Sequence, residues 1–322
     1  MRAWRPDPAI VGPTRPTEHD IDALNDVFTE AFTDRYRRDG LSGVRVPPLN
    51  PAVWRYALRD AGTGAMVWRD ERGAIAAFNV AHGSGCEGWM GPLAVRSDRQ
   101  HVGLGKTIVQ AAIAHLREGG ATTIGLETMP RTVENIGFYA GLGFVPRHLT
   151  VTLTRDLARR LGGRPSLLSS RRADAAAAAL AAARSLTGTL SPGIDFSQEI
   201  RLTAELALGD TCLVEGPTAL DAFALWHSVP LSDTRHRDEI RVLKLVARDP
   251  AAFDAAVGAV EVAASEEGIT RVSVRCQTSY DWAFRRLVAR GYRVRWTDLR
   301  MTLDGYPERC PEPGVVFSNW EI

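Results

Sequence analysis

We expect an α/β protein of two similar domains, and three observations lead to this expectation. The chain has 322 residues, which suits two domains of ordinary size. Apolar residues follow helical and strand spacing in alternation through both halves. The second half also repeats the order of the first, because placing Gly120 on Gly268 brings Gly143 onto Gly291 without a gap.

The first domain, placed at residues 1–155, opens with a helix. In residues 17–32 the apolar side chains Ile21, Leu24 and Phe28 share one helical face, and Thr17 with Asp20 can cap it. The further elements expected here are a helix at 51–61, strands at 65–69, 74–82 and 86–96, a helix from 103 to 118, a strand at 121–127, a helix at 132–142, and one or two strands at 144–155.

Residues 156–195 are predicted to form a linker with one Ala-rich helix at 171–186. The second domain is placed at 196–322. Its expected elements are a hairpin of strands 211–214 and 220–228, a strand at 239–247, a helix at 250–266, a strand at 270–276, a helix at 279–290, strands within 291–303, and a last strand in GVVFSNWEI.

The charge balance argues against a protein built to hold nucleic acid. There are 39 Lys and Arg against 38 Asp and Glu, which gives a net charge of +1. Lys106 and Lys244 are the only lysines, so nearly all basic residues are arginine. This bias fits a GC-rich genome, and the alternative is an arginine surface for anionic ligands.

The cysteines and the apolar runs indicate a cytoplasmic protein without a metal site or a membrane partner. Cys86, Cys212, Cys276 and Cys310 lie far apart, with no CxxC pair or Cys/His cluster. The N-terminus has no signal-peptide core, and the Ala-rich stretch 173–183 is too short to span a bilayer.

The strongest chemical signal is a glycine loop between a strand and a helix, at residues 100–105 (QHVGLG). Gly103 and Gly105 let a ligand approach the backbone, and the following helix start directs N–H groups and a positive dipole outward. A pyrophosphate fits such a cradle, and Arg99 and Lys106 could add charge. The alternative is an ordinary tight turn.

A second signal lies in NIGFYAGLGF, residues 135–144. Asn135 and Tyr139 are four residues apart and therefore share one helix face. Asn can bind amide-like groups, and a Tyr hydroxyl can donate a proton to a leaving group. The alternative is a helix with a core tyrosine.

Together the two motifs resemble the GNAT superfamily of acyl-CoA-dependent N-acyltransferases, over about residues 10–155. The loop QHVGLG matches its (Q/R)xxGx(G/A) pattern, and NIGFYAGLGF matches its late Asn-plus-Tyr helix. The resemblance implies, for each of two GNAT-like domains, a mixed, mostly antiparallel central sheet flanked by helices. It also implies acetyl-CoA or another acyl-CoA as co-substrate.

The resemblance assigns roles to the matched positions. The strand residues 93–95 would offer backbone groups to the pantetheine arm, the loop would hold the pyrophosphate, and Asn135 would contact the CoA arm. Tyr139 would be the general acid for the departing thiolate. Since the amine attacks the thioester directly, Cys86 need not be a nucleophile. The implied cofactor-binding residues are Leu93, Ala94, Val95, Gln100, His101, Val102, Gly103, Leu104, Gly105, Lys106 and Asn135.

The general base is left open among several groups. Glu127 ends the strand at 121–127, which we expect beside the strand at 86–96 that leads into the glycine loop. It is our first candidate for the base, and a structural salt bridge is the alternative role. Glu87 and His82 lie on neighbouring strands, and an ordered water could also serve.

The second half departs from the pattern. Its loop at 245–258 lacks the paired glycines, and Ala283 and Leu287 stand where Asn135 and Tyr139 would be. We therefore expect a degenerate domain and one CoA per chain. Aromatic residues of this half could shape an acceptor cleft or simply form its core: Trp226, Tyr280, Trp282, Trp296 and Tyr306.

The expected reaction is acyl transfer, most simply acetyl transfer, to a primary amine of a small molecule. A protein N-terminus or lysine is a further possible acceptor. Two other functions stay open, a CoA-binding sensor without turnover and a GNAT-fold enzyme with different acyl-CoA chemistry. The oligomeric state is left open.

Overall fold

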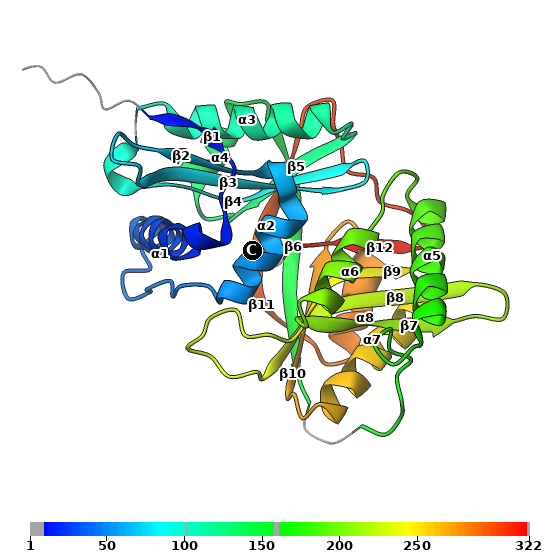
Figure 1. Ribbon diagram of the computed structural model, residues 1–322. Coiled ribbons are helices and arrows are strands. Elements are labelled where there is room, and N and C mark those ends of the chain that lie inside the picture. The colour runs from blue at the N-terminus through cyan, green and yellow to red at the C-terminus, as the bar shows by residue number, and fades with distance from the viewer. Residues whose placement is uncertain (1–9, 101, 158–160, 321–322) are drawn as a thin grey trace, which may run out of the picture.

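A computed structural model describes residues 10–100, 102–157 and 161–320. Figure 1 shows the strands of the first half with α3 above them, α1 below them at the left and α2 near the centre, a second group of strands and helices below, and β6 running between the two groups. The described strands join in one mixed sheet of twelve strands. The elements of the first half are β1 (Val11–Thr14), α1 (Ile21–Arg38), α2 (Pro51–Ala61), β2 (Ala65–Arg69), β3 (Ile75–Ser84), β4 (Glu87–Val95), α3 (Leu104–Glu118), β5 (Thr123–Thr128), α4 (Val133–Ala140) and β6 (Phe144–Asp156).

The second half begins after residue 160. Its elements are α5 (Ala173–Leu190), α6 (Ser197–Glu205), β7 (Gly209–Glu215), β8 (Leu220–His227), β9 (Glu239–Ala247), α7 (Pro250–Glu266), β10 (Arg271–Gln277), α8 (Asp281–Ala289), β11 (Arg293–Leu303) and β12 (Val315–Ser318). The expected helices and strands are confirmed in order and type. The sequence patterns missed β1 and α6, and α5 continues to Leu190 through part of the expected loop.

Local chemistry explains several helix starts. Asn50 accepts a hydrogen bond from the N–H of Ala52 at 2.9 Å, and Pro51 is the first residue of α2. The backbone N–H of Thr17 donates to the Asp20 carboxylate at 2.8 Å, which closes the expected cap before α1.

The two halves repeat one order of elements. β4, α3, β5, α4 and β6 correspond to β9, α7, β10, α8 and β11. The aligned glycines share a left-handed conformation, with φ of +92° at Gly143 and +93° at Gly291. Glycine adopts this conformation at little cost, so both helices end in the same turn. The predicted α/β class, with a mixed and mostly antiparallel sheet flanked by helices, is confirmed.

The halves also share strands. β11 of the second half lies between β5 and β6 of the first, and β6 pairs with β10 on its other side. This exchange could not be predicted from the sequence, because alternation along a strand indicates which face is buried and not which strand lies beside it. The exchange brings residues of β11 into the first half's sheet.

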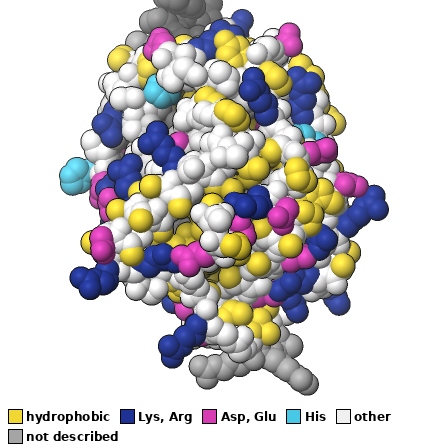
Figure 2. Space-filling view, turned by 90° about the vertical axis from the view of Figure 1, so that its right-hand side faces the viewer, with side chains coloured by type: hydrophobic (Ala, Val, Ile, Leu, Met, Phe, Trp, Pro, Cys, Tyr) yellow, Lys and Arg dark blue, Asp and Glu magenta, His cyan; other side chains and the backbone are white. Residues whose placement is uncertain are grey.

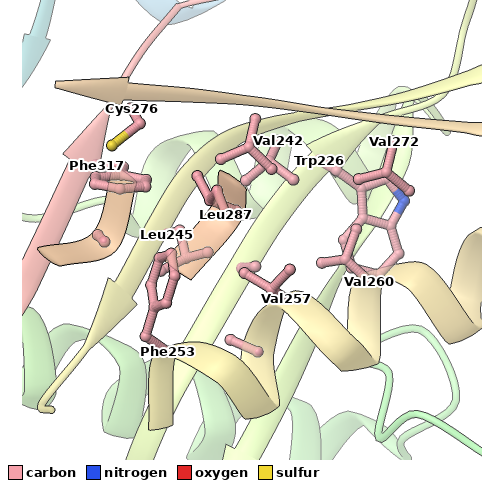
Figure 3. Packing of buried hydrophobic residues seen from close by; sticks show 14 of the residues in the cluster. Trp226, Val242, Leu245, Phe253, Val257, Val260, Val272, Cys276, Leu287 and Phe317 are labelled. Atoms are coloured by element: carbon pink, nitrogen blue, oxygen red, sulfur yellow. The ribbon is translucent and has the colours of Figure 1, made fainter. Parts of the chain in front are cut away.

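Apolar packing supports each face of the sheet. In the second half, Phe253, Val257 and Val260 of α7 pack toward Val242 and Val272 of the sheet (Figure 3). Corresponding clusters lie under α3 and between the sheet and α1 with α2. α5 packs with α6 against β8 of the second half.

The surface has no large basic area in the view of Figure 2, where Lys and Arg side chains alternate with Asp and Glu. This agrees with the near-zero net charge. No helix in the described parts of the chain is long and apolar enough to cross a membrane.

Candidate functional site

The parallel strands β4 and β5 separate beside the loop that leads into α3. They pair as far as Met90 and Leu126. The next residues, Gly91 and Glu127, both line a cavity. β4 is also bulged between Met90 and Leu93, where its register with β3 shifts by one residue. Beyond Gly91, this edge of β4 therefore has no pairing with β5, and its backbone groups are available to a ligand.

The start of α3 offers backbone N–H groups. The helix begins at Leu104, and the N–H of Thr107 bonds the carbonyl of Gly103 at 3.2 Å. The N–H groups of Leu104, Gly105 and Lys106 precede this bond and have no acceptor within the helix. They lie at the positive end of the helix dipole, which favours an anion.

Gly103 is required by its backbone conformation. Its φ is +86°, and a Cβ added there would meet no described atom within 4 Å. A Cβ at Gly105 would lie 3.4 Å from the ring of Phe138, which is ordinary contact. The loop is closed by Gln100, whose Nε2 donates to the carbonyl of Val95 at 3.0 Å.

The other residues expected to bind the cofactor lie on β4, in the glycine loop and at the start of α3. Val102 and Lys106 are exposed, whereas Leu104 is buried and can contribute only its backbone. Ala94 is buried between its half-buried neighbours Leu93 and Val95 on β4. His101 lies outside the described residues.

Tyr139 and Asn135 lie on α4. Asn135 is half-buried, and Tyr139 is 7% exposed with its ring edge against Phe144, 6.1 Å between centroids. Burial raises the pKa of Tyr139, so the phenol keeps its proton at neutral pH. Among the described residues, none forms a hydrogen bond with its hydroxyl. The phenol thus holds the proton that a general acid must donate, but its raised pKa makes it a weaker acid, and Tyr139 is not among the residues that line the cavity.

A cavity of about 610 Å³ lies between the two halves. It borders the place where β4 and β5 separate, at Gly91 and Glu127, which we call the opening. A volume of this size suits a small-molecule ligand. The wall from the first half is apolar and aromatic: Phe28, Phe32, Tyr36, Val46, Leu49, Trp89, Met90 and Pro92.

The opposite wall is the polar face of four strands. On β10, Arg271, Ser273 and Arg275 line the cavity, whereas Val272 and Val274 fill the core behind them. β6 alternates in the same way. The other polar residues of this wall are Thr152, Thr154, Glu239, Arg241, Arg295 and Asp298, and Arg235 lies at its edge.

Glu127 is held in an ion-pair network. Its carboxylate accepts hydrogen bonds from Thr150, from Arg275 and from Nη1 of Arg300 at 2.7 Å. Burial alone would raise the pKa of Glu127, but Arg275 and Arg300 outweigh it and set the pKa to about 2. A carboxylate with so low a pKa is a weak base, so this geometry favours the salt-bridge alternative.

His82 is the imidazole on the cavity wall. Its Nδ1 lies 2.8 Å from Oδ2 of Asp60, and both side chains are buried. Its Nε2 is buried without a hydrogen-bond partner among the described residues. A carboxylate on one ring nitrogen leaves the other free to accept a proton.

Glu87 lies away from the cavity lining. Burial raises its pKa, and the nearby Glu308 acts in the same direction. The neighbouring Cys86 contacts the linker, with its N–H bonded to the carbonyl of Gly193 at 2.8 Å. Neither residue is placed for chemistry at the opening.

In the second half, α7 corresponds to α3, but N–H groups at its start bind a side chain of the chain itself. Asp249 precedes α7, and its carboxylate accepts hydrogen bonds from the N–H groups of Ala251 and Ala252, both at 2.9 Å. Pro250 supplies no N–H. The helix start that would hold an anion is therefore satisfied within the chain.

The expected aromatic residues divide between core and cleft. Trp296 is 41% exposed and lines the cavity. Trp226 and Tyr280 are buried in the core of the second half, and Trp282 packs against it. Tyr306 packs under Arg117, 5.1 Å from its ring centroid.

Some cavity residues were missed although the sequence contains a signal for them. TVTLT at 150–154 and RVSVR at 271–275 alternate polar and apolar residues, which indicates strands with one polar face. Asp60 and Arg300 had no such signal, because distant segments bring them to the site. In the described parts of the chain, no group of three or more His, Cys, Asp or Glu could hold a metal ion.

Comparison with known families finds a match within the first half. Residues 22–144 match the family model described as Acetyltransferase (GNAT) family. No curated protein matches the sequence.

Solved structures resemble the whole chain at low identity. A protein from Pyrococcus horikoshii, provisionally described as an acetyltransferase, has a TM-score of 0.69 at 13% identity, covering 99% of this chain and 97% of that one. A tandem GNAT protein from the clavulanic acid biosynthesis pathway has a TM-score of 0.56 at 14% identity, covering 94% and 100%. Saccharomyces cerevisiae N-myristoyltransferase with bound myristoyl-CoA has a TM-score of 0.61 at 11% identity, covering 92% and 78%. At these identities the likeness establishes the fold.

Proposed function

Since residues 22–144 match the model of the GNAT acetyltransferase family, we propose that the chain transfers an acyl group from acyl-CoA to a primary amine of a small molecule. Acetyl-CoA is the simplest donor. The observation that carries the proposal is the opening between β4 and β5, which borders the cavity between the halves and lies on the strand that leads directly to the free N–H groups at the start of α3.

The donor would follow this path. The N–H groups of residues 102–106, together with the Lys106 side chain, would hold the pyrophosphate. The free edge of β4 from Gly91 to Val95 would pair with the amides of the pantetheine arm, and Asn135 would contact the same arm. The thioester would then lie at the opening, facing the cavity where the amine binds.

The chemistry would be direct attack. The amine nitrogen forms a bond to the thioester carbon, and the carbon–sulfur bond breaks to release the CoA thiolate. We assign the proton lost by the amine to Nε2 of His82, directly or through a water, with Asp60 holding the ring. Tyr139 would donate its proton to the thiolate.

We assign Glu127 to positioning. Its two arginine partners fix the wall of the opening, and its low pKa leaves it ionised and weakly basic. One CoA per chain is proposed, because Asp249 occupies the helix start of the second half. The cysteines at 86, 212, 276 and 310 are unpaired, which supports action in the reducing cytoplasm.

The test is release of free CoA in the presence and absence of amines. We expect thiol release from acetyl-CoA that depends on an added primary amine, with the N-acetylated amine as product. Binding of CoA without release across a broad amine panel would favour the sensor. Release without any amine, accompanied by loss of carbon dioxide from a carboxylated donor, would favour the other acyl-CoA chemistry.

A further inference from the structure

We infer that the acceptor is a primary amine that also carries an anionic group, a carboxylate or a phosphate. The inference rests on the proposed function, since it specifies the acceptor of that same reaction. It follows from how charges are arranged along the cavity between the two halves.

The cavity lining has more arginines than acids. Five arginines line it: Arg235, Arg241, Arg271, Arg275 and Arg295. Three carboxylates line it: Glu127, Glu239 and Asp298. The excess positive charge lies on the polar wall formed by the strands, because the residues of α1 that line the opposite wall are uncharged.

At the inner end, next to the opening, acids and arginines are matched. Arg275 lies 3.0 Å from Asp298 and also binds Glu127, which Arg300 holds from β11. Arg300 is fully buried and shares its guanidinium with Glu308 at 2.8 Å. Glu127, Asp298 and Glu308 thus neutralise these two arginines, so this end has no free positive charge to repel the ammonium form of an arriving amine.

At the outer end the positive charges are not matched. Arg271 is paired with Asp156 at 2.9 Å. Arg235 and Arg295 are exposed, and no ion pair within 4 Å joins either of them to the described chain. Glu239 attracts Arg235 electrostatically, but this one carboxylate also faces Arg241 and Arg271, so the arginines remain in excess. Two free guanidiniums on one side of a cavity are suited to bind a carboxylate or phosphate through charge-assisted hydrogen bonds.

The two ends lie within the length of one small molecule. Arg295 and Asp298 are three residues apart on β11, which corresponds to about 10 Å along a strand. β11 passes from exposed at Arg295 to half-buried at Asp298 and buried at Arg300. An acceptor aligned with this strand would place its amine inward and its anionic group outward.

An aromatic pair lies between these ends. The rings of Tyr36 and Trp296 come from opposite walls, with centroids 6.3 Å apart at 81°. Trp296 is fixed by a hydrogen bond from its Nε1 to Asp298 at 3.1 Å. These rings can pack on an apolar or planar middle part of the acceptor. A polycationic acceptor would meet repulsion from Arg235 and Arg295.

The test uses matched acceptors that differ in the anionic group. With saturating acetyl-CoA, 4-(2-aminoethyl)benzoate is compared with 2-phenylethylamine, and glucosamine 6-phosphate with glucosamine. We expect the anionic member of a pair to have the higher kcat/KM, by about tenfold, as for one charge-assisted contact. The first pair tests a carboxylate and the second a phosphate.

The variant test removes both free cations. Arg235→Ala with Arg295→Ala should raise KM for the acceptor that carries the anion by about tenfold and should not raise KM for CoA or for the partner that lacks the anionic group. Arg72→Ala is the matched control, because Arg72 is exposed, outside the cavity lining and without an ion pair in the described chain. A double variant that behaves like this control, or a preference for the member without the anion, would overturn the inference.

Failure of the proposed function has a different result. If no amine releases CoA, calorimetry titrates 4-(2-acetamidoethyl)benzoate and glucosamine 6-phosphate into the CoA-saturated protein. Binding by the native chain that is lost in the double variant supports the anion site without transfer. No binding of either probe by the native chain overturns the anion site as well.

Discussion

Nη1 of Arg300 lies 2.7 Å from Oε1 of Glu127, and this pair joins the two halves beside the opening. Arg300 stands opposite Glu127 in the pairing of β11 with β5. Its guanidinium also lies over the ring of Trp89, 3.6 Å from the centroid. The strand exchange therefore places a buried cation of the second half against the first candidate base of the first half.

Glu127→Gln should destabilise the fold more than it slows the chemistry. Removal of one partner from a buried ion pair leaves Arg300 uncompensated and costs about 3 kcal/mol of unfolding free energy. Denaturant unfolding measures this cost, and kcat is compared for the folded variants. Glu118→Gln on the surface of α3 is the control. A large loss of kcat at unchanged stability would make Glu127 the base.

Acid titration gives a second readout for the same variant. The pKa of Glu127 is near 4.5 in an unfolded chain and about 2 in the fold. Its stabilising contribution is therefore complete above pH 4.5 and is lost as the pH falls toward 2. The native chain should lose up to about 3 kcal/mol over this window that Glu127→Gln does not lose. Parallel acid curves would contradict the ion pair's role.

His82→Gln should lower kcat by about 100-fold if His82 accepts the proton of the amine. The amide keeps a polar contact to Asp60 but cannot accept a proton at neutral pH. Steady-state rates are measured with KM for acetyl-CoA as the internal control, which should not change. His19→Gln, outside the cavity lining, is the matched variant. An undiminished kcat would transfer the role to water or to another group.

Tyr139→Phe should lower kcat by about 100-fold or more, because the thiolate would lose its proton donor. The substitution removes one oxygen from a buried ring and should leave the fold and the packing against Phe144 intact. Pre-steady-state rates of thiol release separate the chemical step from product release. A native-like chemical rate would remove the acid role from Tyr139.

Gly103→Val should weaken acyl-CoA binding. The position has φ of +86° and lies at the start of the N–H cradle, so a branched side chain disturbs the loop and blocks a phosphate. Gly73→Val in the β2–β3 turn is the matched control, since Gly73 has φ of +79° and equally open surroundings. Both variants should lose similar stability. Equal CoA affinity in the two, measured by calorimetry, would contradict the cradle.

Local features were predictable from the sequence, and long-range ones were not. The order of elements around α3 and α4 followed from apolar spacing and glycine turns, as did the degenerate loop at Pro250. The position of β11 between β5 and β6 did not, because strand pairing depends on distant segments. The surroundings of Glu127 and His82 depend on partners about 170 and 20 residues away, Arg300 and Asp60, so their chemical states could not be predicted from their neighbours in the chain.

The most direct measurement is a single turnover with carbonyl-labelled acetyl-CoA, equimolar protein and an excess of 4-(2-aminoethyl)benzoate or glucosamine 6-phosphate. After quenching, mass spectrometry locates the label in the amine and in the intact protein. We expect the label on the amine nitrogen, one free CoA for each label transferred, and no acylated protein. Label that stays on CoA while CoA is bound, or label that accumulates on the protein, would contradict direct acyl transfer at the opening between β4 and β5.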